Sequence, residues 1–338
     1  MSNSCILNFY NVNIKLMLQN CIQPDVIIAN TKLALNTFAL KIEGQTCDKF
    51  IDATIFFIAD KDELIAYNEM HQEIFIYGNE EQFKSGRSLY YIASYIAECL
   101  SVNKSCSLII HSAAVFLEKT GKSYLLLGEK GAGKTTLTIY LCKECGFKLI
   151  GNDQVRVINN NGILSTREGS CWFDVRKTAL KASKYLGNIG IDVADKPRVT
   201  SWDNKAKILP GALGIETHCE ETVLGGVFNI RIDPFQDEII SQYWSGIQQN
   251  LILHERLGRL VSAQTTPFQD DVGNYFGSLP LINTKINFAI RDEMVKAFIK
   301  NKVIELFGSN VELIVKTFLE AINASSRNSD IKRSRQYS

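Results

Sequence analysis

The sequence predicts an α/β protein with a mixed β-sheet, preceded by a smaller β-rich region at the N-terminus. Between about Cys5 and Tyr77, short apolar runs alternate with clusters of Asp, Asn and Gly, which is typical of short strands and turns. Later, in Leu125–Gln154, a strand pattern runs into a glycine-rich segment and then into a helical pattern. Two regions of different organisation are therefore expected.

The N-terminal region is expected to span residues 1–84 and to consist mainly of short strands. The apolar runs that predict these strands occupy 26–40, 53–60, 63–68 and 73–78. A connecting helix is expected at 85–104, because a set of apolar residues falls on one helical face there. This set comprises Leu89, Ile92, Ala93, Ile96 and Leu100.

The larger domain is expected to span residues 105–324. Two strands should flank a turn at Thr120–Gly121, and the second should deliver the chain to Gly128. A helix is expected from Thr136 to Cys145, ended by Gly146 and followed at once by a strand. Further elements are a strand at 222–233, helical segments at 291–308 and 310–324, and a polar, basic and disordered tail at 325–338.

The composition excludes several classes of protein. The 37 Lys and Arg residues nearly cancel the 36 Asp and Glu residues, so no global charge favours nucleic acid or an anionic membrane as a partner. The nine cysteines are odd in number and scattered, which argues against a secreted disulfide framework. No signal sequence is visible, and no stretch reaches the roughly 18 apolar residues of a membrane span. A soluble, cytoplasmic protein is expected.

Cys142 and Cys145 form a C-x-x-C pair, which could mark a redox or zinc site. They fall on the helix expected after the glycine-rich loop, and no second Cys/His pair lies at the spacing of a zinc finger. Buried, reduced thiols are the favoured interpretation.

The glycine-rich segment from Gly128 to Thr135 fits G-x-x-x-x-G-K-[ST] at every position. Glycines let successive backbone N–H groups converge on phosphate oxygens, Lys134 can neutralise the terminal phosphates, and the Thr135 hydroxyl can ligate Mg²⁺. The alternative is a glycine-rich turn before an ordinary helix. The expected nucleotide-binding residues are Gly128, Glu129, Lys130, Gly131, Ala132, Gly133, Lys134, Thr135 and Thr136.

An acidic residue follows the loop unusually soon. Nucleotide-binding sites of this kind need a carboxylate to hold the metal, and Asp153 lies only 153 − 135 = 18 residues beyond Thr135. One helix and one return strand fit this spacing and would place Asp153 beside the loop. The alternative for Asp153 is a turn residue at a strand end, and His111 taken alone is more typical of a structural histidine.

Basic residues on later loops are weaker candidates for contact with phosphates or substrate. Solvated surface charges are the competing interpretation for each of them. The candidates are Lys205, Lys207, His254, Arg256 and Arg259. Asp270 and Asp271, in a loop bounded by Gly and Pro, are candidates for contact with substrate or metal.

The 47 residues from His111 to Val157 resemble the catalytic domain of HPr kinase/phosphorylase and its HPr-kinase-like relatives. These proteins share a P-loop fold with phosphoenolpyruvate carboxykinase. The shared pattern is a His followed by small residues and a strand, a turn, a strand into the loop, a helix, and a strand that ends in an acidic pair. The resemblance extends loosely over 105–288 and does not include the N-terminal region, which implies a relative with a different substrate.

The resemblance also implies roles for individual residues. His111 matches the family histidine that tunes the catalytic acidic group, and Asp153 matches the second acidic residue, near Mg²⁺. Asn152 stands where the family has its first aspartate, the residue assigned to deprotonating the substrate hydroxyl. An amide cannot accept a proton as a carboxylate does. Either Asp153 therefore has both roles, or His111 is the base, or strong base catalysis has been lost, and the phosphorylase direction is in doubt.

Together, these features predict a Mg²⁺-dependent kinase that transfers the γ-phosphoryl group of ATP or GTP. The acceptor would be a hydroxyl of a small metabolite, a peptide or a protein serine, with no nucleic acid or membrane partner. Members of the family are commonly oligomers, so a homo-oligomer is among the implied partners. The alternative is a nucleotide-binding regulatory or scaffold protein with weak or no phosphotransfer, for which Asn152 is the best evidence. A carboxykinase-like lyase would need a second metal site and further basic residues, which the sequence does not offer.

Overall fold

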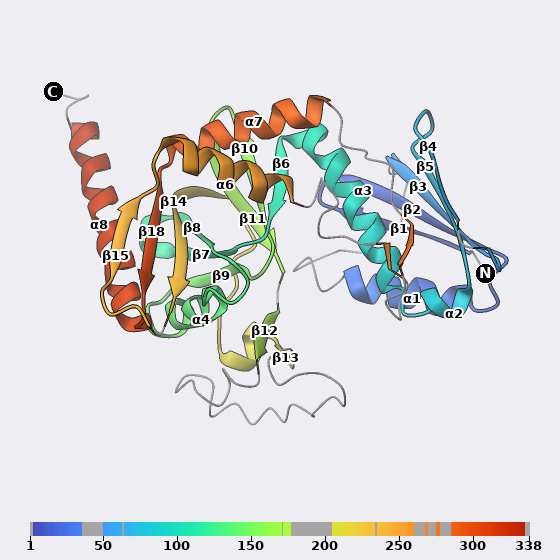
Figure 1. Ribbon diagram of the computed structural model, residues 1–338, viewed down its shortest axis with the longest axis horizontal. Coiled ribbons are helices and arrows are strands. Elements are labelled where there is room, and N and C mark those ends of the chain that lie inside the picture. Colours follow the sequence, from blue (N-terminus) through green and yellow to red (C-terminus); the bar gives the residue numbers. More distant parts are fainter. Residues whose placement is uncertain are drawn as a thin grey trace. The chain divides into compact units, whose positions relative to one another are not determined.

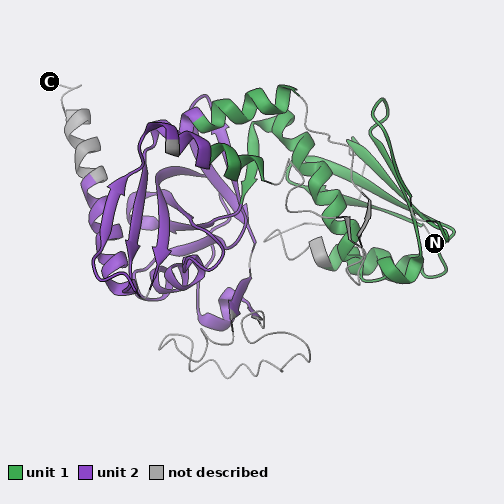
Figure 2. Ribbon diagram, viewed as in Figure 1, with its two compact units in different colours: residues 1–110, 253–295 green, residues 111–252, 296–338 purple. Residues whose placement is uncertain are grey.

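Figure 1 shows the chain as a computed structural model that forms a mixed α/β structure with several β-sheets. The structure describes residues 3–35, 50–62, 64–170, 172–176, 205–233, 235–259, 268–269, 275–277 and 285–334. The chain divides into two compact units (Figure 2). Unit 1 comprises residues 1–110 and 253–295, and unit 2 comprises residues 111–252 and 296–338.

Unit 1 contains a five-stranded sheet with the strand order β1-β2-β3-β5-β4. The strands are β1 (Ser4–Phe9), β2 (Val12–Gln19), β3 (Ala53–Ala59), β4 (Leu64–Asn68) and β5 (Glu73–Gly78). Alternate residues of β2, β3 and β5 are buried, as expected for strands with one face on a core. The strands predicted at 53–60, 63–68 and 73–78 are confirmed.

The strand predicted at 26–40 is wrong over its described part, because residues Pro24–Leu35 form helix α1. Pro24 at the start and Asp25 in the first turn both favour a helix N-terminus. The buried residues Ile27, Ile28 and Thr31 have helical spacing and do not alternate. The β-branched residues had suggested a strand, but burial on one helical face decides the structure; residues 36–40 lie outside the described residues.

Two further helices follow in unit 1, α2 (Glu80–Phe83) and α3 (Arg87–Ser105). Helix α3 confirms the helix predicted at 85–104, and Leu89, Ile92, Ala93 and Ile96 are all buried. Its burial extends well beyond that stripe, to residues such as Tyr95, Glu98 and Cys99. The chain also forms β6 (Ser107–Ile110), α6 (Gly246–Gly258), β16 (Phe268–Gln269), β17 (Tyr275–Gly277) and α7 (Lys285–Lys300).

Unit 2 is built on a sheet in which the strands follow the order β15-β18-β14-β8-β7-β9. These strands are β15 (Ile240–Tyr243), β18 (Val303–Gly308), β14 (Thr222–Ile232), β8 (Lys122–Leu127), β7 (Ala113–Leu117) and β9 (Lys148–Gly151). Strands β8, β14 and β18 are parallel, whereas β7 is antiparallel to both β8 and β9. The predicted strands on either side of Thr120–Gly121 and the strand at 147–151 are therefore confirmed.

The strands that follow β9 along the chain form two further pairs. Strands β10 (Val155–Asn160) and β11 (Ile163–Gly169) form an antiparallel hairpin, and β11 also pairs with the start of β14. Strands β12 (Phe173–Arg176) and β13 (Lys205–Ile208) pair separately as a two-stranded sheet.

The helix predicted at 291–308 is only partly correct. Helix α7 ends at Lys300, and Val303–Gly308 form strand β18. Lys302 has a positive φ of 53°, which breaks the helix, and the following residues pair with β14 on one side and β15 on the other. Helix α8 (Val311–Ser334) confirms the helix predicted at 310–324, and its continuation to Ser334 corrects the predicted start of a disordered tail at residue 325.

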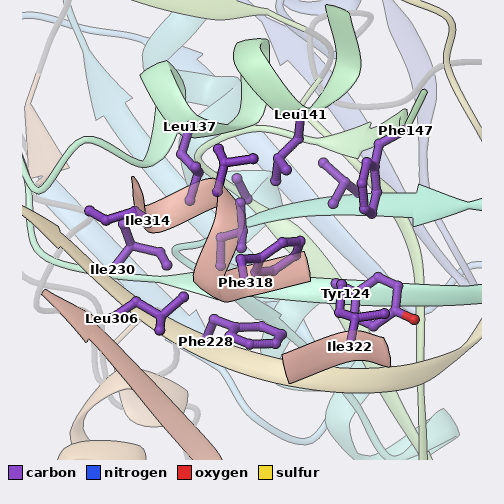
Figure 3. Packing of buried hydrophobic residues seen from close by; sticks show 14 residues of the cluster. Tyr124, Leu137, Leu141, Phe147, Phe228, Ile230, Leu306, Ile314, Phe318 and Ile322 are labelled. Atoms are coloured by element: carbon purple, nitrogen blue, oxygen red, sulfur yellow. The ribbon is translucent and has the colours of Figure 1, made fainter. Parts of the chain in front are cut away.

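The core of unit 2 joins the sheet to helices α4 (Lys134–Glu144) and α8 (Figure 3). Phe318 of α8 is fully buried, and its ring centroid lies 4.4 Å from that of Phe228 and 6.0 Å from that of Tyr124. Leu137 and Leu141 of α4 belong to the same cluster. This packing fixes the junction between β8 and α4, where the glycine-rich loop lies.

Candidate active site

The loop from Gly128 to Gly133 connects the end of β8 to the start of α4. Gly131 and Gly133 have positive φ values of 91° and 93°, which a residue with a side chain rarely adopts. A Cβ on Gly128 would lie 2.7 Å from the carbonyl oxygen of Ile230, and a Cβ on Gly133 would lie 2.4 Å from Cδ1 of Ile232. Two of the motif's glycines are thus required by the close approach of β14 as well as by the curl of the loop.

Lys134 is the first residue of α4, and its ammonium group lies inside the loop. Its Nζ donates hydrogen bonds to the carbonyl oxygens of Gly128, at 2.8 Å, and Glu129, at 3.2 Å. The residue is buried at 5% exposure, although it carries a charge. The positive charge and the N-terminal end of α4 therefore act at the same place, which suits an anion.

Thr135 and Asn152 are brought together by the helix and the return strand. The Thr135 hydroxyl donates to Oδ1 of Asn152 at 3.3 Å, and Nδ2 of Asn152 donates to the carbonyl oxygen of Trp172 at 3.2 Å. Asn152 is completely buried. Both polar groups of the Asn152 amide are therefore hydrogen-bonded within the protein. Its oxygen accepts from Thr135, the residue that the motif assigns as a metal ligand.

His111 and Asp153 form the second pair. Nε2 of His111 lies 3.9 Å from Oδ1 of Asp153, and the two side chains are 34% and 38% exposed. Asp153 has a positive φ of 70°, and its carbonyl oxygen accepts from the backbone N–H of Ser112 at 3.2 Å. Strand β7, which starts directly after Ser112, is thus tied to the end of β9, and the pair faces solvent.

The chain around Asn152 is held by contacts that the sequence did not reveal. A Cβ on Gly151 would lie 2.5 Å from the Cα of Gly169, so the two glycines allow the ends of β9 and β11 to touch. The backbone N–H of Asn152 donates to the carbonyl oxygen of Ser170 at 2.9 Å, and the Ser170 hydroxyl donates to the carbonyl oxygen of Asn152. No spacing rule marks Ser170 or Trp172 as neighbours of the loop, because they arrive only after the β10–β11 hairpin.

The weaker candidates are distributed over both units. Lys205 and Lys207 lie on β13, and Nζ of Lys207 is 5.9 Å from the ring centroid of Trp172, the residue whose carbonyl oxygen accepts from Asn152. Arg256 lies on α6 and Arg259 directly after it, and both belong to unit 1, whereas the loop belongs to unit 2.

His254 pairs locally with Asp292, with 3.4 Å between Nε2 and Oδ1. Asp270 and Asp271 lie outside the described residues.

The C-x-x-C pair lies on the far end of α4. Cys142 and Cys145 both pack against the core cluster of unit 2, and burial raises the pKa of the Cys142 thiol to about 12. Within the part of the chain that the structure describes, no group of three or more His, Cys, Asp or Glu side chains is arranged to hold a metal. Over the same residues, every helix is too short or too polar to cross a membrane.

Comparisons with known proteins give little beyond this geometry. No protein-family model matches the sequence, and no curated protein matches it. Among solved structures, the chain is similar to the HPr(Ser) kinase/phosphatase from Coxiella burnetii, with a TM-score of 0.29 and 12% sequence identity. The match covers 67% of this chain and 98% of that chain.

Proposed function

We propose that this chain is a Mg²⁺-dependent kinase that binds ATP or GTP at the loop from Gly128 to Thr136 and transfers the γ-phosphoryl group to a hydroxyl. The observation that carries the proposal is the position of Lys134. Its ammonium lies buried within a curled loop at the start of a helix, and the loop is framed by glycines that tolerate no Cβ. This arrangement suits the phosphates of a nucleotide.

The oxygen donors beside the loop fit Mg²⁺. The Thr135 hydroxyl and the half-exposed carboxylate of Asp153 are hard donors of the kind that Mg²⁺ takes together with phosphate oxygens. When bound, the ion would neutralise charge that develops on the transferred phosphoryl group. The chain's own part is to hold the phosphates with the loop, to orient Thr135 through Asn152, and to keep Asp153 accessible.

The acceptor hydroxyl needs a group that can receive its proton. Asp153 is the best candidate, because it is half-exposed and lies 3.9 Å from Nε2 of His111, which can stabilise its charge or share the proton. Phosphoryl transfer depends mainly on positioning and charge neutralisation, so one carboxylate with a neighbouring histidine is sufficient for a kinase. The acceptor class remains a small metabolite, a peptide or a protein serine.

A second function is favoured by one specific observation. Asn152 occupies the buried position next to Thr135 with an amide, and both of its polar ends are engaged by the protein. A protein that binds a nucleotide for regulation or as a scaffold, with weak or no transfer, needs no base at this position.

Nucleotide binding is tested first. Calorimetric titration of the Lys134→Ala protein with Mg·ATP and Mg·GTP is expected to show an affinity lower by about 10- to 100-fold, the value of a charge-assisted hydrogen bond. Lys143→Ala is the matched control, because Lys143 is an exposed lysine in the last turn of the same helix and should leave the affinity unchanged. Equal affinities in parent and Lys134→Ala proteins would remove the loop from the proposal.

Transfer is tested with γ-labelled nucleotide and cell extract as the source of acceptors. The parent protein is expected to label an acceptor, and Asp153→Asn is expected to lower the rate by about 10²-fold or more, the contribution of a general base. Undiminished transfer in Asp153→Asn would exclude Asp153 as base. Nucleotide binding without any labelled acceptor would favour the regulatory alternative.

A further inference from the structure

The strand order places different groups on the two sides of the loop. Strand β8 leads into the loop, and β9, which ends at Gly151 just before Asn152 and Asp153, lies beyond β7 on one side. Strand β14 lies on the other side of β8 and runs parallel to it, so that the carboxyl ends of both strands reach the same edge of the sheet. Asp153, which suits a metal and a terminal phosphate, thus lies on the β9 side of the loop. The end of β14 lies on the other side of the loop.

This order fixes the direction of a bound nucleotide, given the proposed function on which the present inference rests. The terminal phosphate must lie near Thr135 and Asp153, because these residues supply the donors for the metal that accompanies it. The phosphate chain occupies the loop itself. The nucleoside end must therefore leave the loop on the side of β14.

The end of β14 is attached directly to the loop. The backbone N–H of Ile232 donates to the carbonyl oxygen of Ala132 at 2.9 Å, and the Ile232 side chain fills the space beside Gly133. Phe235 follows three residues later, which is at most about 10–11 Å even along an extended chain. It therefore lies within the span of a nucleotide held by the loop.

Phe235 is held by a local turn and points its side chain into solvent. One carboxylate oxygen of Asp233 accepts from the backbone N–H of Phe235 at 3.1 Å, and the carbonyl oxygen of Asp233 accepts from Gln236 at 3.0 Å. The backbone N–H of Asp233 is anchored in turn on Gly308 of β18, at 3.1 Å. Phe235 is 92% exposed, compared with 78% for Phe50 and 54% for Phe288.

The geometry points to Phe235 as the platform on which the base of the nucleotide stacks. A single exposed phenylalanine is not unusual on a protein surface. What distinguishes Phe235 is that its turn begins one residue beyond the loop contact of Ile232, on the side where the nucleoside must emerge. Aromatic stacking on a base is worth about 1–3 kcal/mol and is tolerant of base identity, so ATP and GTP are expected to use the platform alike.

The test compares Mg·ATP, Mg·GTP and Mg·tripolyphosphate, which has the phosphates but no base, by calorimetric titration. Phe235→Ala is expected to weaken both nucleotides by about 5- to 100-fold and to leave tripolyphosphate unchanged. Phe235→Trp is expected to retain nucleotide affinity. Phe50→Ala is the control, because Phe50 is 78% exposed in unit 1, and it should leave all three affinities unchanged.

The outcomes separate this inference from the proposed function. Nucleotide affinity in Phe235→Ala within about twofold of the parent value, or an equal loss for tripolyphosphate, would overturn the stacking platform and leave the phosphate site in place. A parent protein that binds none of the three compounds would overturn the proposed function and the platform with it.

Discussion

Replacing Asn152 by aspartate tests how the loop is held by its surroundings. The two side chains have nearly the same shape, but aspartate can only accept hydrogen bonds when it is ionised. Its carboxylate could still accept from the Thr135 hydroxyl, as Oδ1 of Asn152 does at 3.3 Å. It could not donate to the carbonyl oxygen of Trp172, to which Nδ2 of Asn152 now donates at 3.2 Å.

The expected cost follows from these two contacts and from burial. The lost donor leaves the Trp172 carbonyl facing another oxygen, which costs about 1–3 kcal/mol of unfolding free energy. Because position 152 is completely buried, desolvation should raise the pKa of an aspartate there above the unfolded value of about 3.9. The folded state would then bind the proton more tightly than the unfolded state. Stability would be retained below about pH 4 and lost as the pH rises through the folded-state pKa.

Urea unfolding of the parent, Asn152→Asp and Asp153→Asn proteins at about pH 5 and about pH 8 measures this effect. Asn152→Asp should lose about 1–3 kcal/mol at the higher pH and less at the lower pH, and Mg·ATP should restore part of the loss by placing a cation nearby. Asp153→Asn is the matched reverse exchange, and at 38% exposure it should change stability by no more than about 0.5 kcal/mol. Full stability of Asn152→Asp at the higher pH would refute the reasoning.

The remaining predictions concern thiols and a histidine. Iodoacetamide at about pH 8 should label the exposed Cys106 and Cys219 well before Cys142, because burial raises the pKa of the Cys142 thiol to about 12. Mass spectrometry of timed samples measures the order of labelling, and early labelling of Cys142 would contradict the prediction. The pKa of His218 is lowered from 6.5, mainly by burial, so folding stability should fall as the pH drops below that value, where the unfolded chain takes up the proton first. His218→Gln should flatten the dependence of the urea midpoint on pH between about 7 and 5, and an unchanged slope would count against this cause.

The local elements around the loop could be predicted from sequence because their signals are short-range. Strands β7 and β8, helix α4 and strand β9 each follow from apolar runs and glycine positions within a few residues. Two of the errors, at 26–35 and 303–308, arose where the same apolar residues fit either structure. Tertiary contacts determined the structure of both segments. Ile27 and Ile28 are buried on one face of a helix, and Val303–Gly308 pair with β14 and β15 in a sheet.

The candidate site was predictable only in part for the same reason. The loop follows from its motif, and the count of residues in one helix and one return strand predicted Asp153 beside it. In the structure the Thr135 hydroxyl donates to Asn152, one residue earlier. The contacts that hold Asn152 come from Ser170 and Trp172, beyond the β10–β11 hairpin, and depend on a close approach of Gly151 to Gly169. The structure also gives Asn152 and Asp153 different partners, Thr135 for Asn152 and His111 for Asp153, which their adjacency in the sequence did not indicate.

That separation changes what the amide at position 152 implies. From sequence alone, an amide where the resemblance implies an aspartate left the loss of base catalysis open as one of three alternatives. In the structure, Asn152 is completely buried, and its amide is engaged by the Thr135 hydroxyl and by the carbonyl oxygen of Trp172. Asp153 is the half-exposed member, and His111 lies beside it. We therefore infer that Asn152 positions the Thr135 hydroxyl and is not the base, which a transfer rate in Asn152→Asp close to that of the parent would support, whereas a clearly higher rate would contradict it.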